Sequence, residues 1–269
     1  MWTAQDTLAA AQGDETALPR NFLLRSLPQR DLERLSPLLE KVTLTPRRVL
    51  QHAGVPIEHL YFVEDGLVSV LASTDQRNAV EVRLIGCEGS VGSEAVLGVR
   101  VSPLRYFVQI GGSALRIGVA DLSFAMAEMP QLRAVLNAYL HDALMQSSQS
   151  AACSLSHSLI QRLSRWLLTA QDRSDKPELA ITQDLLARSL GVRRASISEA
   201  FKPLEGSGIF ARERGLIRIL DRARLEQLAC RCYRAMRGGR ETPERAKTGR
   251  WPLFLLTLLT LLEIEFLAQ

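Results

Sequence analysis

The stretch ITQDLLARSLGVRRASISEAFKPLEGSGIFARERGLIRIL, residues 181–220, decides the fold of the carboxyl-terminal part of the chain. Thr182 stands where a helix N-cap is expected, and apolar residues follow it at helical spacing as far as Gly191. Gly191 ends that helix, because glycine turns there without steric cost. A second helix begins near Arg193, and its apolar side consists of Ile197, Ala200, Phe201 and Leu204. The stretch therefore predicts two short helices joined by a tight turn.

A basic hairpin follows the second helix. Pro203 predicts a kink or an end of regular bonding late in that helix, and residues 205–208 read as its exit. Residues 209–220 read as two strands around a turn at Gly215, which predicts a basic wing. The paired arginines at the start of the second helix are typical of a helix that enters the major groove of DNA. The alternative is an ordinary pair of packed helices with a solvated basic face.

The segment resembles the winged helix–turn–helix of the Crp/Fnr family of bacterial transcription regulators, and the resemblance covers residues 20–232. It implies that Arg194 contacts guanine. Ala195 falls where a glutamate often reads cytosine, and Glu199 falls where a second arginine often sits, so the operator of the best-known members is not implied here. Glu199 can accept a hydrogen bond from a cytosine amine.

The expected DNA contacts divide into two sets. Facing the bases we expect Arg194, Ser198, Glu199 and Lys202. We expect a second set to bind phosphates and to fix the register of the protein on the DNA. These residues are Thr182, Gln183, Arg193, Ser196, Arg212 and Arg214. Two copies of the chain would place their second helices in major grooves about 34 Å apart on a near-palindromic site.

The amino-terminal part predicts a β-sandwich or roll. Short apolar runs in residues 41–120 alternate with turn signals, which are 53–54, 64–66, 74–75, 85–86 and 111–112. Residues 59–70 are similar to the hairpin signature of the cyclic-nucleotide-binding fold. The fold class expected for the chain is therefore α+β: a double-stranded β-helix or jelly-roll sensor domain, a long dimerisation helix and a winged helix–turn–helix domain.

In that fold a glycine-led cassette holds the nucleotide, with a glutamate on the ribose and an arginine on the cyclic phosphate. The local match keeps the glycine as Gly92. Ser93 stands at the glutamate position with Glu94 one residue late, and Leu104 stands at the arginine position with Arg105 one residue late. A one-residue slip in a strand turns a side chain to the other face. The candidate effector pocket is thus Gly92, Ser93, Glu94 and Arg105, and the alternatives are a roll that binds no nucleotide or a different effector.

Helical patterns connect the two parts. Asp121 is placed to cap a helix over 122–128, and Pro130 opens the next one, which shows apolar residues at 3–4 spacing through 131–149. This is the dimer helix in the resembled family, although periodicity also fits a helix packed wholly in its own monomer. A helix over 155–170 begins the DNA-binding domain. The expected domains are a flexible leader at 1–20, the roll at 21–130, the dimerisation helix at 131–154, the winged helix–turn–helix at 155–232, and a linker with an apolar tail at 233–269.

Composition agrees with a two-domain globular protein whose positive charge is localised. The 269 residues are 46% hydrophobic and 23% charged, with a net charge of +4. Residues 155–240 hold 17 Lys and Arg against 9 Asp and Glu, whereas residues 1–154 hold 13 against 16. The charge therefore concentrates in the segment expected to meet phosphates, which predicts salt-dependent DNA binding.

No catalytic set, phosphate-cradling glycine motif or signal peptide is recognisable, so we expect neither an enzyme nor a secreted protein. Cys230 and Cys232 form a C-x-C pair, but a zinc site needs two more ligands, and we expect none close by. The four histidines show no metal spacing, and we predict no metal site and no cofactor.

The sequence thus predicts a cytoplasmic, homodimeric transcription regulator. Its candidate partners are double-stranded DNA, a second copy of the chain, RNA polymerase and an unidentified small-molecule effector. Two alternatives stay open, an effector-binding module with vestigial DNA binding and a regulator tethered to a membrane by the apolar tail at 251–267. The apolar run in that tail is about 12 residues, short of the ~20 that span a bilayer.

Overall fold

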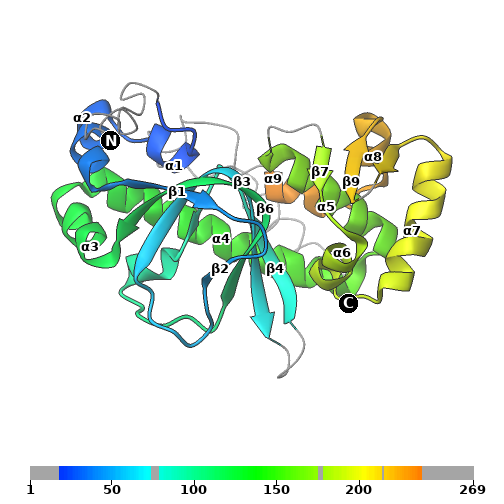
Figure 1. Cartoon of the computed structure of the whole chain (residues 1–269), viewed down its shortest axis with the longest axis horizontal. Helices are drawn as coiled ribbons and strands as arrows, with labels where there is room; N and C mark the ends of the chain where they lie inside the picture. The colour runs from blue at the N-terminus through cyan, green and yellow to red at the C-terminus, as the bar shows by residue number, and fades with distance from the viewer. Residues whose placement is uncertain (1–17, 74–78, 175–177, 214, 238–269) are drawn as a thin grey trace, which may run out of the picture.

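The computed structural model describes residues 18–73, 79–174, 178–213 and 215–237. A β-roll and a carboxyl-terminal helical domain lie side by side, and the long helix α4 runs between them (Figure 1). This is the expected α+β architecture. The expected leader lies almost wholly outside the described residues, and the apolar tail at 251–267 lies outside them entirely. Among the described residues, no helix is long and apolar enough to cross a membrane.

One antiparallel sheet forms the roll. Its main path runs β1-β6-β3-β4, with β2 added to β6 and β5 added to β3. The strands are β1 (Glu40–Leu44), β2 (Val49–Gln51), β3 (His59–Ser73), β4 (Ala79–Ile85), β5 (Ser90–Val91) and β6 (Arg105–Gly118). The short helices are α1 (Phe22–Arg25), α2 (Gln29–Leu35), η1 (Ser36–Leu38) and η2 (Ser93–Leu97).

Two of the expected turns are instead bends inside long strands. Residues 59–70 do not form a hairpin, because β3 continues to Ser73 and pairs with β6 along its length. Gly66 takes φ +91°, and a Cβ added there would lie 2.6 Å from the carbonyl oxygen of Ile110. A Cβ on Gly112 would lie 2.2 Å from the carbonyl oxygen of Asp65. The two glycine signals therefore mark one place where both strands bend together, with backbones too close for a side chain.

The helices that leave the roll agree with the periodic pattern but are longer. α3 (Val119–Glu128) begins before Asp121, whose side chain makes no cap bond, and α4 (Pro130–Ser156) extends beyond the expected 131–149. Leu132, Val135 and Leu136 on α4 join the apolar core under the roll. α4 includes residue 155, and the next helix, α5 (Leu159–Arg173), starts after it at a capping box formed by Ser158 and Gln161.

The carboxyl-terminal domain contains the predicted motif. Its elements after α5 are β7 (Glu178–Ala180), α6 (Gln183–Leu190), α7 (Arg194–Gly206), β8 (Phe210–Glu213), β9 (Leu216–Ile219), α8 (Arg222–Leu228) and α9 (Cys232–Arg237). Thr182 Oγ1 accepts from the Leu185 amide at 3.3 Å, and Gly191 takes φ +64°, so both predicted caps are confirmed. α7 continues to Gly206 through Pro203 rather than ending there. Residues 233–237, expected in a linker, belong to α9.

Candidate nucleic-acid interface

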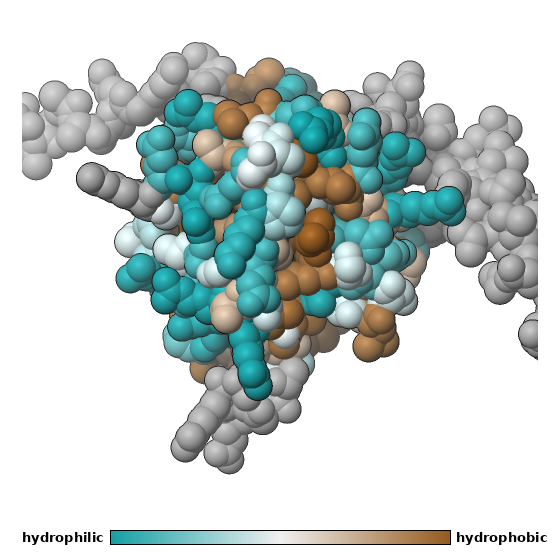
Figure 2. Space-filling view, turned by 90° about the vertical axis from the view of Figure 1, so that its right-hand side faces the viewer, coloured by the Kyte–Doolittle hydropathy of each residue, from teal (hydrophilic) through white to brown (hydrophobic). Residues whose placement is uncertain are grey.

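Helix α7 has one side buried in the domain and one side exposed to solvent. Ile197, Ala200, Phe201 and Leu204 are buried on one side of the helix. Arg194, Glu199 and Lys202 are exposed on the other. α7 lies at the end of the molecule farthest from the roll (Figure 1), and the view onto this end shows hydrophilic side chains over most of the face, with an apolar strip between them (Figure 2). The helix is thus free of the sensor domain and presents its polar side outward.

Arg194 opens α7 and has an acidic neighbour on α6. Its Nε lies 3.6 Å from Asp184 Oδ1, and the two side chains are 67% and 57% exposed. An ion pair this exposed contributes about 0–1 kcal/mol, so the guanidinium can exchange it for another partner at small cost. Arg193 is the N-cap residue of α7 and its side chain makes no cap bond. Both arginines therefore stand at the leading end of the helix, as the sequence predicts.

Three other expected contact residues also hold the motif together. Ser198 Oγ donates to Gln183 Oε1 at 2.8 Å, which joins α7 to α6. The Thr182 hydroxyl is occupied as the N-cap of α6. These groups orient the two helices against each other, a role that the sequence analysis did not assign to them.

The wing is present, and one of its arginines is anchored to α7. β8 and β9 pair antiparallel, and Gly215 between them takes φ +85°. Arg212 lies 3.1 Å from Glu205, and its guanidinium sits 5.2 Å from the centre of the Phe201 ring. Arg212 therefore packs on α7 as well as facing outward. Arg214 lies outside the described residues, and Ser196 is half-buried in the first turn of α7.

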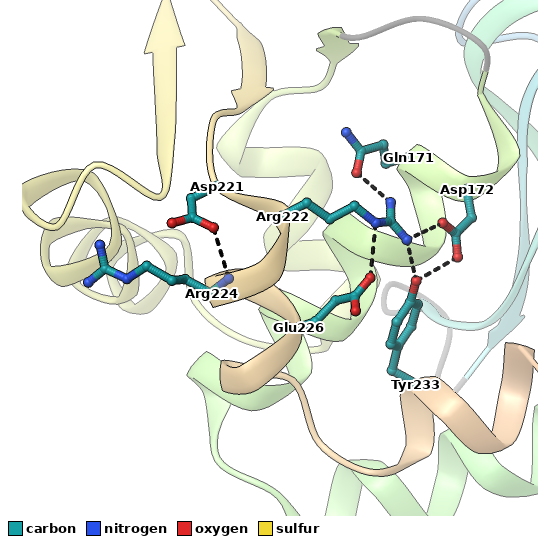
Figure 3. A network of polar contacts seen from close by, with 7 residues as sticks. All are labelled: Gln171, Asp172, Asp221, Arg222, Arg224, Glu226 and Tyr233. Carbon is teal, nitrogen blue, oxygen red and sulfur yellow. Dashed lines mark hydrogen bonds and ion pairs between the residues drawn. The ribbon is translucent and has the colours of Figure 1, made fainter.

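A polar network fixes the end of the domain on α5. Arg222 donates to Gln171 and Asp172, each at 2.6 Å, and to Glu226 at 2.9 Å (Figure 3). It also donates to the hydroxyl of Tyr233, which in turn donates to Asp172 at 2.8 Å. This network positions α8 and the start of α9 against α5.

The helical domain also packs directly on the roll through a buried polar contact. Glu81 of β4 accepts from Trp166 Nε1 at 2.7 Å and from Ser189 Oγ at 3.0 Å. Burial raises the pKa of the Glu81 carboxyl above its usual value, and its hydrogen bonds oppose that shift in part.

A buried ion pair adds to the contact between the helical domain and the roll. Arg173 Nε of α5 lies 2.7 Å from Glu88 Oε1 of the roll, with 2% and 10% of the side chains exposed. Arg173 also donates to the Leu84 carbonyl. The two domains thus meet in one desolvated surface, and nothing in the sequence pattern indicated it.

The candidate effector pocket is only partly assembled. Gly92 takes φ +77° and leads η2, and Ser93 is buried. Glu94 points inward, where its Oε1 accepts from Ser102 at 2.8 Å and from Tyr106 at 2.5 Å. The structure does not bring Arg105 to these residues, because its side chain is exposed at the start of β6. Burial and the Glu94 carboxylate together hold the pKa of the Tyr106 hydroxyl above its usual range.

The expectation that Cys230 and Cys232 have no further ligands nearby is wrong. Cys153 and His157, at the end of α4, lie beside them, and the four ligand atoms are all within 4.8 Å of one another. The helix spacing of Cys153 and His157, one turn apart, was the signal that could have been noticed. The fold alone joins this pair to the C-x-C pair 73 residues later.

A winged helix–turn–helix attached through a long helix to a β-roll defines a class of DNA-binding regulator. Residues 161–228 match the family model described as the Crp-like helix-turn-helix domain. This segment is therefore a Crp-like helix-turn-helix domain, as the sequence predicts.

Solved structures share this fold at low identity. FixK2 from Bradyrhizobium japonicum is 18% identical, with a TM-score of 0.62 over 71% of this chain and 98% of that one. The c-di-GMP responsive global regulator CLP from Xanthomonas campestris is 17% identical, with a TM-score of 0.58 over 71% and 99%. A CooA mutant from Carboxydothermus hydrogenoformans is 13% identical, with a TM-score of 0.56 over 80% and 96%. At these identities the likeness establishes the fold. No curated protein matches the sequence.

Proposed function

We propose that this regulator binds a near-palindromic DNA site as a cytoplasmic homodimer, with Arg194 reading a guanine in each half-site. The observation that carries the proposal is the exposed start of α7, where the one ion pair of Arg194 with a described residue, Asp184, is weak and solvated. A bidentate arginine on guanine discriminates by about 1–3 kcal/mol against another base. That gain exceeds the about 0–1 kcal/mol of the Asp184 pair.

The remaining base contacts follow from exposure. Glu199 and Lys202 project from the same side of α7 and would meet bases next to the guanine. Ser198 sits closer to α6 and would contribute through its hydrogen bond with Gln183 as much as through DNA. The phosphate contacts proposed are Thr182, Gln183, Arg193, Ser196, Arg212 and Arg214.

The dimer would form along α4. Leu144 and Met145 are adjacent large apolar side chains on this helix, and they are 60% and 47% exposed. A groove of about 380 Å³ lies next to them, lined by α4 and α9. Pairing of two α4 helices about a twofold axis would cover this surface and set the half-site spacing at about 34 Å.

The roll would regulate DNA binding through the surface where it touches the helical domain. Arg105 points to solvent, so the arginine that the resemblance places on a cyclic phosphate is not in the cassette, and the buried guanidinium of Arg83 already interacts with Glu94 and Tyr106. We therefore propose an effector other than a cyclic mononucleotide, acting by shifting the contact made by Glu81, Glu88, Trp166 and Arg173. A ligand can shift this contact only as far as its affinity differs between the docked and undocked forms.

Selection of bound sequences from random duplex DNA tests the proposal. We expect the wild type to enrich an inverted repeat, and Arg194→Ala to lose about 10–100-fold of its preference at one position of each half-site. Arg193→Ala is the matched control, because it removes the neighbouring arginine and should weaken binding to all sequences alike while flattening the salt dependence. Arg212→Ala is a poorer control, since Arg212 also packs on Phe201. Enrichment of no motif, or the same loss of preference in both variants, would overturn the proposal.

A further inference from the structure

Four metal-ligating side chains meet where the long helix ends. Cys153 lies in the last turn of α4 and His157 is its C-cap residue. Cys230 lies between α8 and α9, and Cys232 begins α9. Their ligand atoms are all within 4.8 Å of one another. Cys153, His157, Cys230 and Cys232 are called the thiol–imidazole cluster below.

The distances within the cluster match a single ion. Cys153 Sγ lies 3.5 Å from Cys230 Sγ, and Cys232 Sγ lies 3.7 Å from His157 Nδ1. Zinc bonds of about 2.3 Å to sulfur and about 2.0–2.1 Å to nitrogen place neighbouring ligands of a tetrahedron about 3.5–3.8 Å apart. A cluster of several iron atoms would need its ligands spread more widely, around more than one metal. The geometry therefore selects a mononuclear site.

The surroundings suit a thiolate-bound metal. The three cysteines are 0–4% exposed, so an ion bound between them would be shielded from water. Gln149 Nε2 donates to Cys232 Sγ at 3.1 Å, the kind of second hydrogen bond that orients metal ligands.

Two further features fit an occupied site. Arg162 carries a buried Nε that has no hydrogen-bond partner among the described residues, and the charge of Arg162 interacts with Cys153 and Cys230. A zinc ion with three thiolates and one imidazole has a net charge of −1, which this guanidinium would balance. Tyr233, next to Cys232, is held by Asp172 through the network of Figure 3, so the start of α9 is positioned without the metal. The ligands are therefore pre-arranged.

We propose that the thiol–imidazole cluster binds one zinc ion as a closed, tetrahedral Cys₃His structural site. Binding replaces the protons of the three thiols, so one Zn²⁺ enters and about three protons leave. Because the cluster joins the end of α4 to the α8–α9 segment, the ion spans the junction at residues 156–158 between the long helix and the DNA-binding domain. Its bound state fixes the angle at which that domain leaves α4.

Metal analysis of the full-length protein, isolated without oxygen and reconstituted with zinc, tests the site. We expect about one zinc per chain and, after cobalt substitution, the absorption of tetrahedral cobalt with thiolate ligands. Cys153→Ser and Cys232→Ser should lower zinc affinity at least about tenfold. Cys87→Ser is the matched control, since Cys87 is the one cysteine of the chain outside the cluster, and it should bind zinc as the wild type does.

Zinc content and the cobalt spectrum of the wild type test the site even if a variant fails to fold. Fewer than about 0.1 zinc per chain after reconstitution, an octahedral cobalt spectrum, or equal loss of zinc in Cys87→Ser and Cys232→Ser would each overturn the proposal. So would a Cys153–Cys230 disulfide in metal-free protein isolated without oxygen. The readout is metal content, so it stands apart from DNA binding and from the function proposed above.

Discussion

The buried ion pair between Arg173 and Glu88 should decide whether the DNA-binding domain stays docked on the roll. Glu88→Gln removes the charge and keeps a side chain of the same shape with one oxygen acceptor. The Arg173 guanidinium, 2% exposed, would then remain buried and lose the charge of the Glu88 carboxylate. Its contacts with the Leu84 carbonyl and with Gln146 Oε1, at 2.9 Å in the second case, would stay.

The magnitude follows from burial and distance. Two unit charges about 4 Å apart attract by about 4 kcal/mol at an effective dielectric constant of about 20. Loss of one partner from a buried pair costs about 3–5 kcal/mol. Because the amide of the substituted side chain would keep an oxygen near Arg173, we expect the lower end, about 3 kcal/mol. That cost raises the undocked-to-docked ratio roughly 100-fold.

Hydrogen–deuterium exchange of the amides in β4 measures this ratio, because β4 lies under the docked domain and pairs with β3 on one side. We expect faster exchange of β4 in Glu88→Gln at temperatures where the pairing of β1 with β6 still exchanges as in the wild type. Glu40→Gln is the matched control. It removes the carboxylate from an ion pair with Arg116 in which Glu40 is 62% exposed, so about 0–1 kcal/mol and no change in β4 are expected.

Unchanged β4 exchange in Glu88→Gln would refute this reasoning. So would a double-mutant cycle with Arg173→Gln that gives a coupling energy below about 1 kcal/mol, since that is the value of an exposed pair. Equal effects of Glu88→Gln and Glu40→Gln would likewise show that burial does not set the strength of this contact.

Two further outcomes are expected. Burial raises the pKa of the Glu81 carboxyl in the folded state above its usual 4.5, so the folded protein takes up this proton at a higher pH than the unfolded chain does. Protonation of Glu81 should therefore favour folding increasingly as the pH falls from the raised folded-state pKa towards 4.5. Glu81→Gln should therefore melt higher than the wild type near neutral pH, with the advantage shrinking in acid; an advantage that grows in acid would contradict the sign. Phe201→Ala empties a fully buried site whose ring meets Phe210 edge-on at 5.0 Å. It should lower the free energy of unfolding by about 3–5 kcal/mol in urea melts, against under about 1.5 kcal/mol for the volume-matched Leu204→Met, and a loss below about 1 kcal/mol would contradict the packing.

The DNA-binding motif was predictable because its signals are local. Thr182 and Gly191 act on backbone groups within four residues of themselves, and the apolar side of α7 follows from the 3.6-residue period of one helix. The effector cassette was harder to predict, since the position of Arg105 depends on strand register. The Arg105 side chain is exposed because of the register in which β6 pairs with β3 and β2. The sequence pattern alone does not give that register.

The amino-acid order by itself determined that this chain carries a winged helix–turn–helix, a β-roll and a long helix between them, because caps, turns and periodicity are written within a few residues. Only the tertiary structure decided that Glu88 meets Arg173, that Gly66 faces the strand at Gly112, and that Cys153 lies against Cys230. These contacts join residues 46 to 85 positions apart. They form because the packing of elements brings distant side chains together, and no periodic pattern records which ones will meet.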